Sequence, residues 1–210
     1  MVAMISQHTE QTIRTYKQYI QNNIYNSNLN ITIMKYFKIF DMIKCFFEKK
    51  SDRCEGCQLE QAAKSLPYGI KENAEALMNT ILEPVREMYG KPVLIINGFC
   101  CPVRLRMIGE SVKSPLVKGE AVDISAVPQP GMTEHELAME NLELARCVLK
   151  VGGFDVMLLG DVEKDSIEPK WIKVAWKRNG ENLGMVLKKR RGSGAYENLS
   201  RLDFQQLMTE

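Results

Sequence analysis

Apolar residues recur at intervals of three and four over residues 71–89, and this spacing predicts an amphipathic helix. Pro84 lies inside the segment and should kink the helix, because proline has no backbone N–H to donate. Gly90 follows the last apolar position and predicts the end of the helix. The positions expected on the buried face are Leu77, Ile81, Leu82, Val85 and Met88.

A second helix is predicted to begin after Thr133. Thr133 and Glu136 have the spacing of a capping box, in which two side chains satisfy backbone N–H groups of the first turn. Gly152-Gly153 predicts its end, and His135 in its first turn is expected at the surface. The expected buried positions are Leu137, Leu142, Leu144, Ala145, Val148 and Leu149.

Short, almost wholly apolar runs predict strands around these helices. They cover residues 92–97, 121–124, 154–159 and 171–176. Turn signals at residues 179–184 predict a hairpin that leads into a further strand at 185–188.

The chain has 210 residues, of which 45% are hydrophobic, so it can bury one good core. We expect a domain over residues 34–188, with a poorly ordered leader at 1–33 and a basic tail with a short helix at 189–210. The leader is rich in Gln, Asn, Thr and Tyr, and Met34 begins a segment typical of a domain start. We therefore hypothesise that Met34 is the true initiator.

The net charge of +2 gives no global field that would attract nucleic acid or an anionic membrane. Residues 188–191 are the basic exception, which we interpret as a solvated tail, with contact to an anionic polymer as the alternative. The sequence contains neither a run of about 18 apolar residues nor a signal-peptide pattern, so we expect a cytoplasmic protein without a membrane partner.

The six cysteines are expected to be reduced thiols, because no export signal accompanies them. Cys54 and Cys57 form a C-x-x-C pair, for which ordinary thiols, a structural zinc ion and a redox pair are the alternatives. A nucleophilic Cys100 would need a base such as His within reach, and the sequence implies none.

The loop that begins at Ser114 tightens at Gly119, and the short apolar strand after it ends on a carboxylate, Asp123. Their pattern resembles the S-x-H-x-x-G-x-A-x-D signature of the zinc D-alanyl-D-alanine carboxypeptidases and the related phage cell-wall peptidases, whose fold the hedgehog amino-terminal domain shares. The residues in register with this signature are Ser114, Gly119, Ala121 and Asp123. Leu116 stands where the family has a zinc-binding histidine.

Other segments extend the resemblance over roughly residues 34–178. The turn at 97–102 is similar to the family's S-G-Y-R-C-P, with Cys100 in place of an arginine that holds substrate. Residues 154–160 are similar to the family's F-D-x-x-I-x-E: Phe154 and Asp155 match, and Gly160 occupies the position of the catalytic glutamate. The strand that starts at Trp171 resembles W-[IV]-H-V-S: Trp171 matches, and Lys173 stands in place of the last zinc histidine.

The resemblance implies a hedgehog/DD-peptidase fold, which is an α+β single domain with a small, mostly antiparallel sheet packed against helices. It also implies that Asp123 is the only zinc ligand left, that no catalytic residue remains and that no cofactor is expected, although zinc is the family cofactor. The inherited binding positions are Ser114, Cys100, Asp123, Trp171 and Lys173. Because the counterparts of Asp123 and Lys173 bind one ion, we predict that these two side chains form a salt bridge.

These observations favour a degenerate, non-catalytic relative that retains a cleft for a peptide, in a phage or mobile-element setting. Its partner would be a peptidoglycan stem peptide or another protein. One alternative is an active zinc metallopeptidase that cleaves stem peptides, and another is a decayed reading frame without a selected activity.

Overall fold

The computed structural model describes residues 35–43, 68–107, 109–193 and 195–209. All of them belong to one unit, Met34–Glu210. The predicted leader, the proposed start at Met34 and the C-x-x-C pair lie outside the described residues.

A six-stranded sheet forms the centre of this unit, in the order β1-β2-β4-β3-β5-β6. Neighbouring strands are antiparallel except β3 and β5, which are parallel. With helices packed against the sheet, this arrangement confirms the predicted α+β class. The strands are β1 (Val93–Asn97), β2 (Ala121–Ala126), β3 (Val156–Val162), β4 (Trp171–Ala175), β5 (Met185–Arg190) and β6 (Glu197–Asn198).

The predicted hairpin into β5 was wrong. Both edges of β4 are already paired, one with β2 and the other with β3. The chain after β4 therefore passes to the free edge of β3, and β5 pairs there in parallel. The turn residues at 179–184 serve this longer connection.

The first predicted helix begins earlier than expected and is interrupted. It comprises α4 (Tyr68–Leu77), a π-helical turn η3 (Met78–Leu82) and α5 (Glu83–Tyr89). Pro84 lies in the first turn of α5, and the Glu83 N–H donates to Met78 O across the π turn. A π turn thus lies directly before the turn that contains Pro84, which has no backbone N–H to donate. The other helical segments are α2 (Ile39–Ile43), α6 (Pro102–Met107), η4 (Pro115–Lys118), α7 (Glu134–Val151) and α8 (Arg201–Met208).

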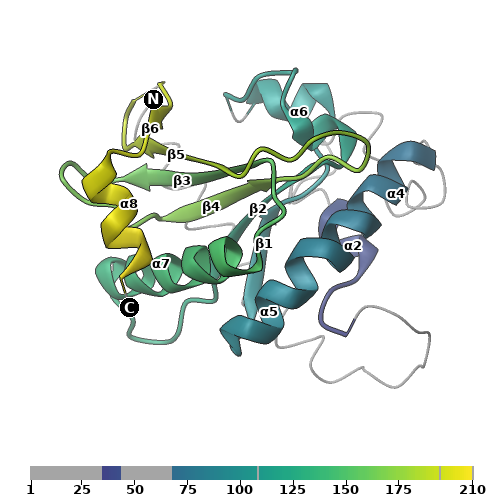
Figure 1. Cartoon of the computed structure of the whole chain (residues 1–210). Helices are drawn as coiled ribbons and strands as arrows, with labels where there is room; N and C mark the ends of the chain where they lie inside the picture. The colour runs from purple at the N-terminus through teal and green to yellow at the C-terminus, as the bar shows by residue number, and fades with distance from the viewer. Residues whose placement is uncertain (1–34, 44–67, 108, 194, 210) are drawn as a thin grey trace. The chain divides into compact units, whose positions relative to one another are not determined.

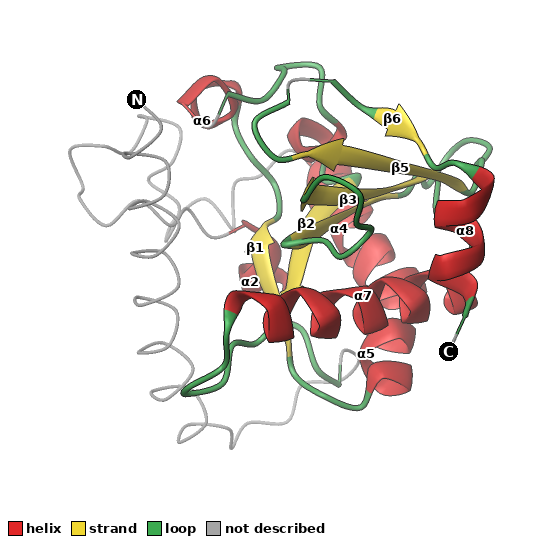
Figure 2. Ribbon diagram, turned by 90° about the vertical axis from the view of Figure 1, so that its left-hand side faces the viewer, coloured by secondary structure: helices red, strands yellow, loops and turns green. Residues whose placement is uncertain are grey.

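The main core lies between the sheet and α7, with α5 packed against α7 (Figures 1 and 2). The predicted capping box of Thr133 and Glu136 is present at the start of α7. Asn141 of α7 is fully buried, and its amide oxygen accepts a hydrogen bond from Ala126 N at 2.7 Å while its amide nitrogen donates to Lys170 O at 2.8 Å. This side chain fixes α7 against β2 and the entry to β4.

Two cations at the C-terminal end of β5 are paired with acidic side chains. Lys188 contacts Asp203 of α8 at 2.7 Å, and Arg190 contacts Glu197 at 3.1 Å. Leu207 of α8 is fully buried in the main core. In the described part of residues 189–210, expected as a basic tail, the chain thus completes β5 and forms β6 and α8.

Candidate functional site

The two strand residues expected at the site, Asp123 and Lys173, face each other. They are direct partners in the antiparallel register of β2 and β4, so their side chains point to the same face of the sheet. Lys173 Nζ lies 3.7 Å from Asp123 Oδ1, which confirms the predicted salt bridge. Asp123 is 6% exposed and Lys173 is 8% exposed, so the pair is removed from water.

A second carboxylate contacts the same ammonium. Glu110 Oε2 lies 3.2 Å from Lys173 Nζ, and the Glu110 side chain is 15% exposed. Glu110 belongs to the loop between α6 and η4, where no periodicity or motif marked it in the sequence. We call Glu110, Asp123 and Lys173 the buried ion cluster.

Polar side chains from β1 and α6 extend the cluster. Asn97, the β1 partner of Asp123, donates from Nδ2 to Asp123 Oδ2 at 3.0 Å. Arg104 of α6 donates from Nη2 to Asn97 Oδ1 at 2.9 Å, so it fixes the orientation of that amide. Asp123 Oδ1 is buried and has no hydrogen-bond partner, which leaves the charge of Lys173 as its compensation.

Burial and charge act in opposite directions on these groups. Burial raises the pKa of Asp123 above its ordinary value, against the lowering effects of Lys173 and Asn97. Burial disfavours the charged form of Lys173, but attraction to Asp123 and Glu110 outweighs it and raises the Lys173 pKa. Lys173 therefore remains protonated, whereas burial disfavours the ionised form of Asp123.

The Gly160 position has no room for a side chain. Gly160 of β3 pairs with Trp171 of β4, and a Cβ atom built on Gly160 would lie 2.1 Å from the Trp171 ring. The centre of that ring is also 5.8 Å from Lys173 Nζ, within cation–π range. Trp171 thus occupies the space into which a glutamate at position 160 would project.

Leu116 fills an apolar cluster on the same side of the molecule as the ion cluster. It is fully buried, and it follows Ser114, whose Oγ accepts a hydrogen bond from Leu116 N at 3.4 Å. The turn closes at Gly119, whose φ of 69° is left-handed and whose Cβ would lie 2.6 Å from Ile70 O. The other buried members of this cluster are Cys100, Leu105, Ala121 and Ala175.

Cys100 is 2% exposed, and burial raises the pKa of its thiol to about 11. A neutral, covered thiol is a poor nucleophile near neutral pH. His135, expected at the surface, is there, with its side chain 73% exposed and its Nδ1 3.1 Å from Glu168.

The residues at this site do not fit a catalytic zinc ion. Zinc takes three protein ligands from His, Cys and carboxylate side chains and keeps a fourth position open. Here the ammonium of Lys173 lies against both carboxylates, where it would repel a dication. Within residues 35–43, 68–107, 109–193 and 195–209, no group of three or more His, Cys, Asp or Glu side chains is arranged to hold a metal ion.

The helices in the described part of the chain are too short or too polar to cross a membrane.

Residues 47–146 match the family model of Peptidase M15. That range includes Leu116 and Asp123 and ends before Gly160 and Lys173. Comparisons with curated proteins and with solved structures found no match. Over residues 47–146 the chain is therefore similar to the M15 peptidases, in agreement with the resemblance of its turn and strand motifs.

Proposed function

We propose that this chain is a peptidase-like protein that has lost catalysis and acts by binding a peptide. The observation that supports the proposal is the position of Lys173, whose ammonium lies between Asp123 and Glu110. A zinc peptidase needs a metal ion there to lower the pKa of a water molecule and to polarise the substrate carbonyl. A lysine ammonium supplies the positive charge without an open coordination position, so it stabilises the fold and does not activate water.

The missing general base points the same way. A base must lie within hydrogen-bond reach of the water whose proton it takes. Trp171 fills the space beside Gly160, and Glu110 is held by Lys173 at 3.2 Å. Neither position offers a free carboxylate.

The surface beside the buried ion cluster is suited to binding. Tyr196 is 52% exposed and lies close enough to Glu110 and Lys173 for their charges to affect its pKa, which burial raises. Exposed tyrosines are enriched at binding surfaces because they combine an apolar ring with a polar tip. We infer that a peptide would contact this outer surface, because Asp123, Lys173 and Cys100 are themselves buried. A peptidoglycan stem peptide is the first ligand to test, and a partner protein is the second.

Metal content and turnover on the same preparation test the proposal. We expect zinc-supplemented, untagged protein to carry no zinc that depends on Asp123, and to leave a D-Ala-D-Ala stem peptide intact while isothermal titration detects its binding. Zinc lost on Asp123→Ala, together with chelator-sensitive hydrolysis, would overturn the proposal in favour of an active metallopeptidase. Zinc lost only on Cys54→Ser and Cys57→Ser would indicate a separate structural site and would leave the proposal standing.

A further inference from the structure

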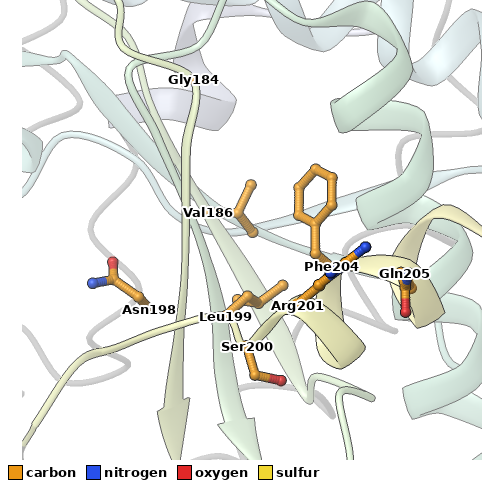
Figure 3. Close-up of a pocket in the computed structure, with 8 residues that line it drawn as sticks. All are labelled: Gly184, Val186, Asn198, Leu199, Ser200, Arg201, Phe204 and Gln205. Atoms are coloured by element: carbon orange, nitrogen blue, oxygen red, sulfur yellow. The ribbon is translucent and has the colours of Figure 1, made fainter.

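A pocket of about 500 Å³ lies between β5 and the first turns of α8 (Figure 3). None of its lining residues belongs to the buried ion cluster or to its polar neighbours. Its volume is in the range of pockets that hold small ligands or single side chains. It is therefore a separate candidate for binding.

One wall of the pocket is apolar. Val186 projects from β5 toward Phe204 of α8, and Leu199 comes from the segment just before the helix (Figure 3). Phe204 remains 43% exposed. An apolar group placed against these three side chains would remove more of their surface from water.

The rim of the pocket carries a positive charge that no acidic side chain among the described residues neutralises. Arg201, the first residue of α8, lines the pocket and forms no ion pair within the described part of the chain. The acid nearest in sequence, Asp203, is held by Lys188 at 2.7 Å. Lys188 and Arg190 of β5 are each paired with an acid, so Arg201 differs from these two cations.

We propose that this pocket binds a carboxylate attached to an apolar group. The guanidinium of Arg201 presents a planar pair of donors that matches a carboxylate, and the apolar group would lie against Val186, Leu199 and Phe204. Asn198 and Gln205 also line the pocket. An N-acylated amino acid and the C-terminal residue of a peptide share this chemistry. The inference does not depend on the function proposed above.

Titration of the full, ¹⁵N-labelled chain followed by NMR tests this site. The probes are N-acetyl-leucine and a short peptide ending in leucine, each with a free and with an amidated carboxyl group. We expect shifts at Val186, Leu199 and Phe204, and we expect amidation to weaken binding about tenfold or more, because a charge-assisted hydrogen bond is lost. Tighter binding of the peptide would identify a peptide C-terminus as the ligand, whereas equal binding would identify a small carboxylate.

Arg201→Gln should weaken the binding of the two probes with a free carboxyl group about tenfold. It should leave the binding of the amidated probes unchanged. Arg106→Gln is the matched control, because Arg106 is an exposed arginine on α6, which lies apart from α8 in both views (Figures 1 and 2). Phe204→Ala should weaken the binding of free and amidated probes alike. Thermal unfolding of this variant checks that α8 remains folded. The proposal is overturned if no probe shifts the pocket residues, or if Arg201→Gln and Arg106→Gln affect the free acids equally.

Discussion

The indole of Trp171 lies against Gly160 on the neighbouring strand, so closely that even a methyl group at position 160 would overlap the ring. The two residues are direct partners of β4 and β3, which means that their side chains share one face of the sheet. The absence of a side chain at position 160 and the packing of the tryptophan are therefore one structural feature. A carboxylate at position 160 would require the indole to leave its place.

Gly160→Ala should destabilise the protein by about 1–3 kcal/mol, because the new methyl group forces the Trp171 ring out of its packing. Urea unfolding measures the change. Gly69→Ala is the control, since a Cβ there meets no atom within 4 Å and lies in helix α4. It should be neutral or stabilising by up to about 1 kcal/mol. Trp171→Ala combined with Gly160→Ala should cost less than the sum of the single changes, and strict additivity would contradict the overlap.

Lys173→Met should cost about 3–5 kcal/mol, because two mostly buried carboxylates would lose their shared cation. Lys71→Met provides the comparison. Lys71 pairs with Glu75 on the surface of α4, where its side chain is 48% exposed, so its loss should cost about 0–1 kcal/mol. Chemical unfolding of both variants at neutral pH gives the two values. A Lys173→Met protein as stable as the parent would show that the buried ion cluster does not support the fold.

The salt bridge of Asp123 and Lys173 could be predicted, because each residue occupies a motif position whose counterpart in the zinc peptidases binds the same ion. Glu110 could not, since it reaches Lys173 from a loop whose path the local sequence does not encode. The Trp171 ring fills the space beside Gly160 because β3 and β4 pair, and the pairing of strands depends on residues far apart in the sequence. The parallel partner of β5 was missed for the same reason. Asn141 did leave a signal, because it lies in the apolar stripe of α7 between Leu137 and Leu144.

The raised pKa of Asp123 predicts an unusual sign of pH dependence. A carboxyl whose pKa is higher in the folded state takes up a proton on folding, so its contribution to stability is present below its ordinary pKa of 3.8 and is lost as pH rises through the folded value. Asp123→Asn removes this titration. The free energy of unfolding of the parent, relative to that of the variant, should therefore fall as pH rises above 3.8.

Urea unfolding of the parent and Asp123→Asn proteins from about pH 4 to about pH 7 measures that difference. Asp203 supplies a contrast, because hydrogen bonds from Lys188 and Ser200 outweigh its desolvation and lower its pKa. The difference between the parent and Asp203→Asn should rise with pH only up to the ordinary pKa of 3.8 and should be nearly flat from about pH 4 to about pH 7. If the parent gained stability over Asp123→Asn with rising pH, the attraction of Lys173 would outweigh burial, and the direction given for Asp123 would be wrong.

Cys100 should resist alkylation in the folded protein. Its thiol is 2% exposed, and with a pKa of about 11 it carries little thiolate near neutral pH. Iodoacetamide labelling followed by peptide mass spectrometry should find Cys100 modified at least about tenfold more slowly than Cys101, its partly exposed neighbour. Unfolding in urea should equalise the two rates. Equal rates in the folded state would mean that this thiol is open to solvent, and thiol chemistry at the family's arginine position would then have to be considered.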